Sequence, residues 1–325
     1  MIATAERLER GPNLVVEVTL LGVLATLWGA SYSLIKLGVA TIPPLTLIAA
    51  RTAIAGAALL AVARARGTAL PRDGATWRRL LVQACLNSVV PFTLIGWAER
   101  TVDAGLAAVL NSTTPVFAFL ITAALTRHEP VTGRKLAGVA AGLAGTCLVV
   151  GTDALHGLGR EILAQLAIVA ATVCYAGAAI VGRGFRGLSP VVPAAGSLLC
   201  GAAVLVPLSL AVDRPWTLRP LPASVLALLA LSLLSTALAF TIYFRLVRTL
   251  GSVGTTAQAY LRVPIGVAAG MLFLGETLSP TAWAGLLCVV AGVAATAVPA
   301  RPPRPDAGGQ LAWPGRACST PPGSC

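Results

Sequence analysis

Two arginines stand in the middle of long apolar segments, where a charged side chain is costly. Arg51 lies in the segment LIAARTAIAG, and Arg262 lies in YLRVP, two residues before Pro264. Ionisable groups inside such segments usually face a cavity or another helix. One interpretation is that the arginines hold an anionic group of a substrate, such as a carboxylate. The alternative is that each guanidinium ties helices together through backbone carbonyls.

Other polar and aromatic side chains occupy similar positions and could line the same binding site. Amides can bond to a substrate or to a neighbouring helix, and Tyr and Trp add polar tips to aromatic rings. These further candidates are Asn111, Gln258, Tyr260, Asn87, Trp28, Tyr32, Trp97, Tyr175 and Tyr243. Trp97 and Tyr243 stand near segment ends, so a place in an interfacial aromatic belt is the alternative for them. Pro115 and Pro264 each remove a backbone hydrogen bond and are candidate hinges.

Carboxylates are scarce in the apolar segments. Glu129 and Glu276 each close one of them. Proton coupling is one interpretation, but we favour a structural role near the N-terminus of the next helix. Glu17 is a weaker candidate for a proton site. The segments contain no paired carboxylates, His-rich cluster or nucleotide-binding motif, so we predict no catalytic residue, metal site or cofactor.

Composition indicates an integral membrane protein. Of 325 residues, 56% are hydrophobic and 11% are charged, whereas a soluble domain carries about 25% charged residues. The apolar residues form runs of about 20, the length of a helix that crosses a bilayer. Ten spans are predicted, at 14-36, 44-63, 79-98, 104-125, 134-152, 162-182, 190-212, 222-244, 252-274 and 279-298.

Charge distribution predicts the orientation of these spans. Lys and Arg concentrate in the two tails and in the even-numbered loops, which places both termini in the cytoplasm by the positive-inside rule. The same rule accounts for the net charge of +12, so nucleic acid is not a predicted partner, whereas the lipid bilayer is. The predicted parts are a cytoplasmic tail (1-13), two five-span units (14-152 and 162-298) and a disordered cytoplasmic tail (299-325).

The two five-span units repeat one another. Glu129 and Glu276 are 147 residues apart, and each precedes two Ala-Gly pairs at equal spacings. Five is odd, so the second unit enters the membrane from the opposite side. Inverted repeats of this kind give transporters a central site that faces either side in turn. Gly138, Gly142 and Gly145 form a stripe that lets another helix approach closely, within the chain or in a homodimer.

Four stretches make the chain resemble the EamA-type permeases of the drug/metabolite transporter superfamily. They are WGASYSLIKLG, NSVVPFTLIGWAERTVDAGLAAVLNSTTPVFAFL, the segment that follows Glu129, and its second copy ending in LGETLSPTAWAGLLCVVAG. The resemblance implies an all-α membrane fold of ten helices in two inverted repeats, located in a bacterial inner membrane. It also implies export or exchange of small metabolites, often amino acids or related compounds. The chain departs from the family in YLRVP, where a charge is added and the proline comes one place later.

We therefore expect a secondary transporter that works by alternating access on a small polar metabolite. Proton coupling and facilitated exchange both remain open as the energy source. The alternative from another class is a membrane-embedded scaffold or transferase without transport activity.

Overall fold

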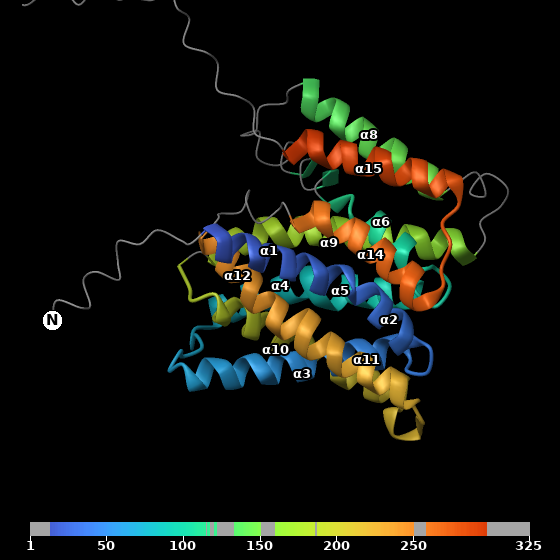
Figure 1. Cartoon of the computed structure of the whole chain (residues 1–325). Helices are drawn as coiled ribbons and strands as arrows, with labels where there is room; N and C mark the ends of the chain where they lie inside the picture. Colours follow the sequence, from blue (N-terminus) through green and yellow to red (C-terminus); the bar gives the residue numbers. More distant parts are fainter. Residues whose placement is uncertain are drawn as a thin grey trace, which may run out of the picture.

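The computed structural model of the chain is built from helices (Figure 1). It describes residues 14–114, 116–117, 120–121, 133–150, 160–185, 187–249 and 258–297. The α-helices are α1 (Leu14–Gly29), α2 (Ser31–Val39), α3 (Pro44–Ala65), α4 (Gly74–Ala84), α5 (Val90–Ala98), α6 (Ala104–Asn111), α8 (Gly133–Val150), α9 (Arg160–Gly182), α10 (Val191–Val212), α11 (Pro222–Ser232), α12 (Ala239–Thr249), α14 (Gln258–Leu274) and α15 (Pro280–Ala297). Two π-helical turns, η1 (Cys85–Val89) and η5 (Leu233–Leu238), and two short 3-10 turns, η3 (Arg183–Phe185) and η4 (Pro215–Thr217), complete the set.

These helices confirm the predicted all-α membrane fold. Within the described residues, six stretches are long and apolar enough to cross a membrane: Leu14–Val39, Pro44–Ala65, Gly74–Ala98, Glu161–Gly182, Val191–Val212 and Pro222–Tyr243. Shorter apolar helices cover Leu136–Gly145, Leu261–Leu274 and Pro280–Gly292 in the fifth, ninth and tenth spans. The fourth span begins with α6 at the predicted residue, and part of it lies outside the described residues.

Local chemistry accounts for several helix starts. Asp73 precedes α4, and its carboxylate accepts a hydrogen bond of 2.7 Å from the backbone N–H of Thr76, which satisfies a donor that the helix itself cannot. Proline begins both α3 (Pro44) and α11 (Pro222), where its missing N–H is not needed. The spans therefore begin where the sequence supplies a cap or a proline.

The helices of one repeat pack against those of the other in matched pairs. The third span contacts the sixth (α5 with α9), and the equivalent eighth span contacts the first (α12 with α1). Likewise, α6 of the fourth span contacts α9, while α14 of the ninth contacts α1. The second and seventh spans (α3 and α10) and the fifth and tenth (α8 and α15) pair directly. Each contact is reproduced when the repeats are exchanged, as a pseudo-twofold axis requires.

The two π-helical turns occur at equivalent places in the repeats. η1 begins at Cys85 in the third span and η5 begins at Leu233 in the eighth, 148 residues later. A π-helical turn adds a residue within a helix and is frequent at functional sites. The α-helix is therefore interrupted at the same place in the middle of the third and eighth spans.

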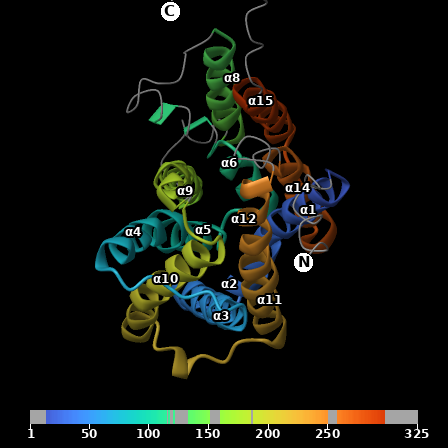
Figure 2. The same cartoon turned by 90° about the vertical axis from the view of Figure 1, so that its left-hand side faces the viewer.

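Seen from the side, α8 and α15 form an outer layer, and α3 and α10 lie at the opposite side of the bundle (Figures 1 and 2). α8 and α15 approach each other through glycines. A Cβ added at Gly145 would meet the backbone O of Gly285 at 2.7 Å, and one at Gly292 would meet the backbone O of Gly138 at 2.5 Å. The predicted glycine stripe is thus confirmed as a close helix contact, and it lies within the chain.

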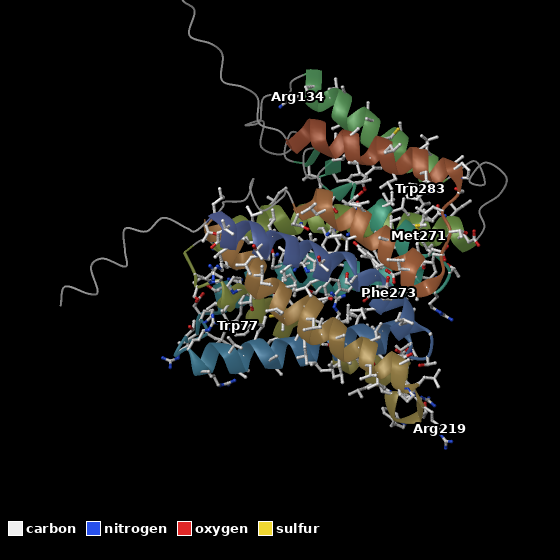
Figure 3. All side chains as sticks on the ribbon, viewed as in Figure 1. Trp77, Arg134, Arg219, Met271, Phe273 and Trp283 are labelled. Atoms are coloured by element: carbon white, nitrogen blue, oxygen red, sulfur yellow. The ribbon has the colours of Figure 1, made fainter. Side chains whose placement is uncertain are left out.

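Large apolar side chains point away from the bundle. Leu272 and Phe273 of α14 are 79% and 77% exposed, and Leu287 of α15 is 69% exposed. Figure 3 labels Phe273 toward the same end of the molecule as Arg219, with Trp77 toward the opposite end. Such a surface suits lipid tails, which are as apolar as leucine.

Candidate functional site

Arg51 of α3 lies at the centre of the bundle, between the two repeats. Its guanidinium is buried, and its Nε donates a hydrogen bond of 2.8 Å to Oγ1 of Thr236 in η5. Its Cζ atom also lies 3.8 Å from the centre of the Phe92 ring, a cation–π contact. The first repeat supplies Arg51 and Phe92, and the second supplies Thr236. Both contacts are to side chains and not to the backbone carbonyls of the alternative interpretation.

Two tyrosines link Arg51 to Arg262. The ring of Tyr175 in α9 packs edge-on against Phe92, with centroids 6.5 Å apart. Both arginines interact electrostatically with Tyr175 and with the buried Tyr32 of α2. The structure therefore brings together four of the predicted site residues from four spans.

A close helix crossing sets the position of Arg262. A Cβ added at Gly29 would meet the backbone O of Arg262 at 2.9 Å, and one at Gly266 would meet Ala108 Cβ at 2.7 Å. Glycine is needed at both places, because α1, α6 and α14 could not otherwise come so close. This crossing fixes the backbone of α14. The Nε of Arg262 is buried and has no hydrogen-bond partner among the residues that the structure describes.

Two buried amides accompany Arg262. Asn111 at the end of α6 donates a short hydrogen bond from Nδ2 to the hydroxyl of Tyr32, and its Oδ1 has no partner in the described part of the chain. Gln258 lies one turn before Arg262 in α14, and its buried Oε1 likewise has no partner within the described ranges. Residues four apart share a helix face. Counting only described residues, the centre thus contains one unpaired cationic N–H and two unpaired amide oxygens. Together they match an anionic group and a group that donates hydrogen bonds.

Trp28 and Tyr243 form an aromatic group next to this centre. The ring of Trp28 lies 5.4 Å from that of Tyr243 and 6.2 Å from that of Phe240. Phe240 follows Thr236 by one turn of helix, so the group adjoins the site of Arg51. Tyr243 is therefore packed against the first span through Trp28.

The remaining predicted residues are placed differently. Trp97 of α5 is 44% exposed and is turned by about 140° around the helix from Phe92, at 100° per residue. It therefore does not join the central group. Asn87 is half-buried in η1, and Pro264 is exposed on α14, which continues through it. The side chain of Tyr260 and the whole of Pro115 lie outside the described residues.

Charged groups gather at the two ends of the bundle. At one end, which we call the Glu17 end, the buried carboxylate of Glu17 in α1 pairs with Arg245 of α12 at 2.9 Å and accepts a bond of 2.9 Å from Thr249. At the other end, which we call the Glu276 end, Nζ of Lys36 donates a hydrogen bond of 2.7 Å to the backbone O of Val102. Both groups lie where spans enter or leave the bundle.

Glu276 joins the two repeats at its end. Its two carboxylate oxygens accept hydrogen bonds from the backbone N–H groups of Ala104 (2.8 Å) and Gly105 (2.9 Å), which begin α6. A Cβ at Gly270 would collide with the same carboxylate. Glu276 thus bonds a helix N-terminus, but that helix is the fourth span of the other repeat, so the predicted place at the start of the next helix was wrong. Glu129 lies outside the described residues.

Two residues of interest were not predicted from the sequence. Thr236 has an ordinary side chain among the apolar residues of the eighth span, and its bond to Arg51 gives no sequence signal. Glu99 falls between the predicted third and fourth spans, yet it is 0% exposed. A carboxylate that follows an apolar run without any spacer is the one feature that could have drawn attention to it.

Comparisons with known proteins agree with this architecture. A model of the EamA-like transporter family matches residues 17–151 and again 162–298. The chain is 29% identical over 274 residues to the "Uncharacterized inner membrane transporter YedA" of Escherichia coli K12, covering 83% of this chain and 87% of the relative. It is 27% identical over 268 residues to the "Probable terminal-alkyne amino-acid exporter" of Streptantibioticus cattleyicolor, covering 82% and 88%.

A solved crystal structure has the same fold. It superposes with a TM-score of 0.60 at 22% identity and covers 86% of this chain and 96% of the other. The family model matches both repeats, and the structure pairs those repeats helix by helix. The chain therefore belongs to the EamA-like transporter family, within the drug/metabolite transporter superfamily, and is a membrane transport protein.

Proposed function

We propose that this protein is a secondary transporter that exports or exchanges amino acids or closely related zwitterions. One observation carries the proposal: the unpaired Nε of Arg262 lies in the same buried group as the unpaired amide oxygens of Asn111 and Gln258. A guanidinium binds a carboxylate, and amide oxygens accept bonds from an ammonium group. The relative named as an amino-acid exporter supports the same substrate class.

Polar atoms buried without partners are costly in an empty site. Each such atom costs about 1–3 kcal/mol. A fold retains these atoms where a ligand supplies the missing hydrogen bonds. Arg51 differs, because Thr236 and Phe92 already engage it. We infer that Arg262 binds the substrate carboxylate, whereas Arg51 contributes to the shape and the positive potential of the site.

Alternating access would work by relative movement of the two five-span units about this centre. The contacts that must break and reform are those at the Glu17 and Glu276 ends, since both join one repeat to the other. Equivalent π-helical turns in the third and eighth spans give both repeats an irregular point at the level of the site.

Exchange in liposomes tests the proposal. Purified protein is reconstituted into liposomes preloaded with unlabelled amino acids, and entry of each of the twenty radiolabelled amino acids is measured. We expect exchange of at least one. Arg262→Ala should abolish it while the protein stays folded, and Arg262→Lys should retain part of it, because it keeps the charge but not the paired N–H groups.

Arg64→Ala is the matched control, because Arg64 is exposed at the end of α3 and its removal should leave exchange unchanged. Folded protein that exchanges none of the amino acids would contradict the substrate class. An unfolded Arg262→Ala protein would support the alternative, in which Arg262 ties helices together.

We further propose a bacterial inner-membrane location with both termini in the cytoplasm, on the basis of the Lys and Arg distribution. This places the Glu17 end at the cytoplasmic face and the Glu276 end at the outer face. Alkaline phosphatase fused after the last span should be inactive, and the same enzyme fused in the loop at Arg219 should be active. The reverse pattern would contradict the orientation.

A further inference from the structure

Glu99 is a buried carboxyl group that the transport site does not use. It follows α5 directly, is 0% exposed, and neither of its carboxylate oxygens has a hydrogen-bond partner within the described ranges. A buried carboxylate anion without donors is strongly disfavoured relative to the neutral acid. The geometry around Glu99 therefore favours the protonated form.

The charged neighbours of Glu99 are engaged elsewhere. Lys36 and Arg51 act on it electrostatically as cations, Glu276 as an anion, and Tyr32 also interacts with it. Lys36 bonds the backbone O of Val102 at 2.7 Å and lies 3.7 Å from Asp103. Arg51 is held by Thr236 and Phe92. Neither cation donates a hydrogen bond to Glu99.

Glu99 and Glu276 form a pair of carboxyls with opposite surroundings. Glu276 receives two backbone N–H groups at the positive end of α6. Among the described residues, Glu99 has no comparable pair of donors: its carboxylate oxygens make no hydrogen bond of good geometry, and the backbone of Lys36 contributes only weakly. The lack of comparable donors singles out Glu99 as the carboxyl of this pair that can hold a proton.

We propose that Glu99 is the proton-binding site through which this transporter couples substrate movement to a proton. The proton is held on a carboxylate oxygen in the conformation described. It leaves to water when the Glu276 end opens and Lys36 turns from Val102 and Asp103 to pair with the resulting carboxylate. The inference rests on the proposed transport function and decides between proton coupling and facilitated exchange.

Infrared spectroscopy tests the proton site without any substrate. The full-length protein in lipid nanodiscs is measured at neutral pH for the C=O stretch of a protonated carboxylic acid, which carboxylates and amides lack. We expect the band in the wild-type protein and its loss in Glu99→Gln. Glu161→Gln removes an exposed carboxyl of α9 and should leave the band unchanged. Glu276→Gln should also keep it, and Glu99 should then ionise at lower pH because a neighbouring negative charge is gone.

Two results would overturn the site: absence of the acid band in the wild-type protein, and its persistence in Glu99→Gln. If Glu99→Gln does not fold, Glu99→Asp replaces it, and an acid band of unchanged frequency would count against Glu99. Because this measurement needs no substrate, it can succeed even if the amino-acid panel is not transported.

The coupling step has its own test in the same liposomes. Once an amino acid is exchanged, a pH gradient should drive its accumulation by the wild-type protein. Glu99→Gln should lose that accumulation and retain exchange, since a permanently neutral side chain carries no proton across. Accumulation by Glu99→Gln equal to that of the wild-type protein would contradict coupling at this residue.

Discussion

At the Glu17 end, a carboxylate of the first repeat meets an arginine and a threonine side chain of the second; at the Glu276 end, a carboxylate of the second repeat meets two backbone N–H groups of the first. Both contacts cross between repeats. Arg245 has a side chain that is 54% exposed, so solvent and salt weaken its attraction to Glu17. Ala104 and Gly105 are buried, and the bonds that they donate to Glu276 are screened less.

The repeat itself explains part of this difference. Glu276 has an equivalent carboxylate in Glu129, 147 residues earlier. Glu17 corresponds to Ala164 at the same offset, and Arg245 corresponds to Trp97 at an offset of 148. The carboxylate that follows the fourth and ninth spans is thus common to both repeats, whereas the ion pair is particular to one end. A transporter whose ends are joined unequally favours opening at the more weakly joined end, which here is the Glu17 end.

Of the variants that test this comparison, Glu276→Ala should lower the free energy of unfolding the most. It removes two charge-assisted hydrogen bonds and leaves buried N–H groups at the start of α6 without a partner. We expect the free energy of unfolding in detergent to fall by about 2–4 kcal/mol, measured by chemical denaturation followed by circular dichroism. Gly270→Ala should act in the same direction, because its Cβ would displace the same carboxylate.

Glu161→Ala and Gly22→Ala are the matched controls for these two variants. Glu161 is exposed, and a Cβ at Gly22 would meet nothing within 4 Å, so neither should lower stability appreciably. A Glu276→Ala protein as stable as the Glu161→Ala protein would contradict the stronger joining of the Glu276 end.

Arg245→Ala should have an intermediate effect. It leaves the buried Glu17 with the hydroxyl of Thr249 as its remaining donor among the described residues, and the free energy of unfolding should fall by about 1–3 kcal/mol. Arg245→Lys should restore part of the loss, because it keeps the charge. Arg219→Ala, at an exposed arginine, controls for removal of a positive charge. A loss larger than that of Glu276→Ala would reverse the order of the two ends.

The sequence predicted the central site better than the ends. Arg51, Arg262 and Asn111 could be selected because an apolar span seldom tolerates such side chains without a partner or a ligand. Trp97 could not be separated from Tyr175 in the same way. Both are aromatic residues within spans, and only the rotation of each helix decides which of them faces the centre.

The ends depend on contacts between residues far apart in the chain. Glu276 bonds Ala104 and Gly105 across 172 and 171 residues, and the partner atoms are backbone groups that every residue possesses. No residue type therefore marks them in advance. Glu99 was missed for a related reason: its burial arises from how the helices and loops at that end pack, whereas its place in the sequence, after the last residue of a span, is typical of a solvated loop.

Asp103→Asn should lower the free energy of unfolding the least. It tests whether the Lys36–Asp103 ion pair or the backbone bonds of Glu276 join the repeats at the Glu276 end. The carboxylate of Asp103 lies 3.7 Å from Nζ of Lys36, with side chains 49% and 25% exposed, and it caps no N–H of α6. A half-exposed pair contributes about 0–1 kcal/mol, and Lys36 keeps its bond to Val102. The free energy of unfolding should therefore fall by less than about 1 kcal/mol, and the loss should shrink further in high salt. A loss as large as that of Glu276→Ala would mean that the Glu276 end is joined by its ion pair, and the contrast between backbone and side-chain bonding at the two ends would then fail.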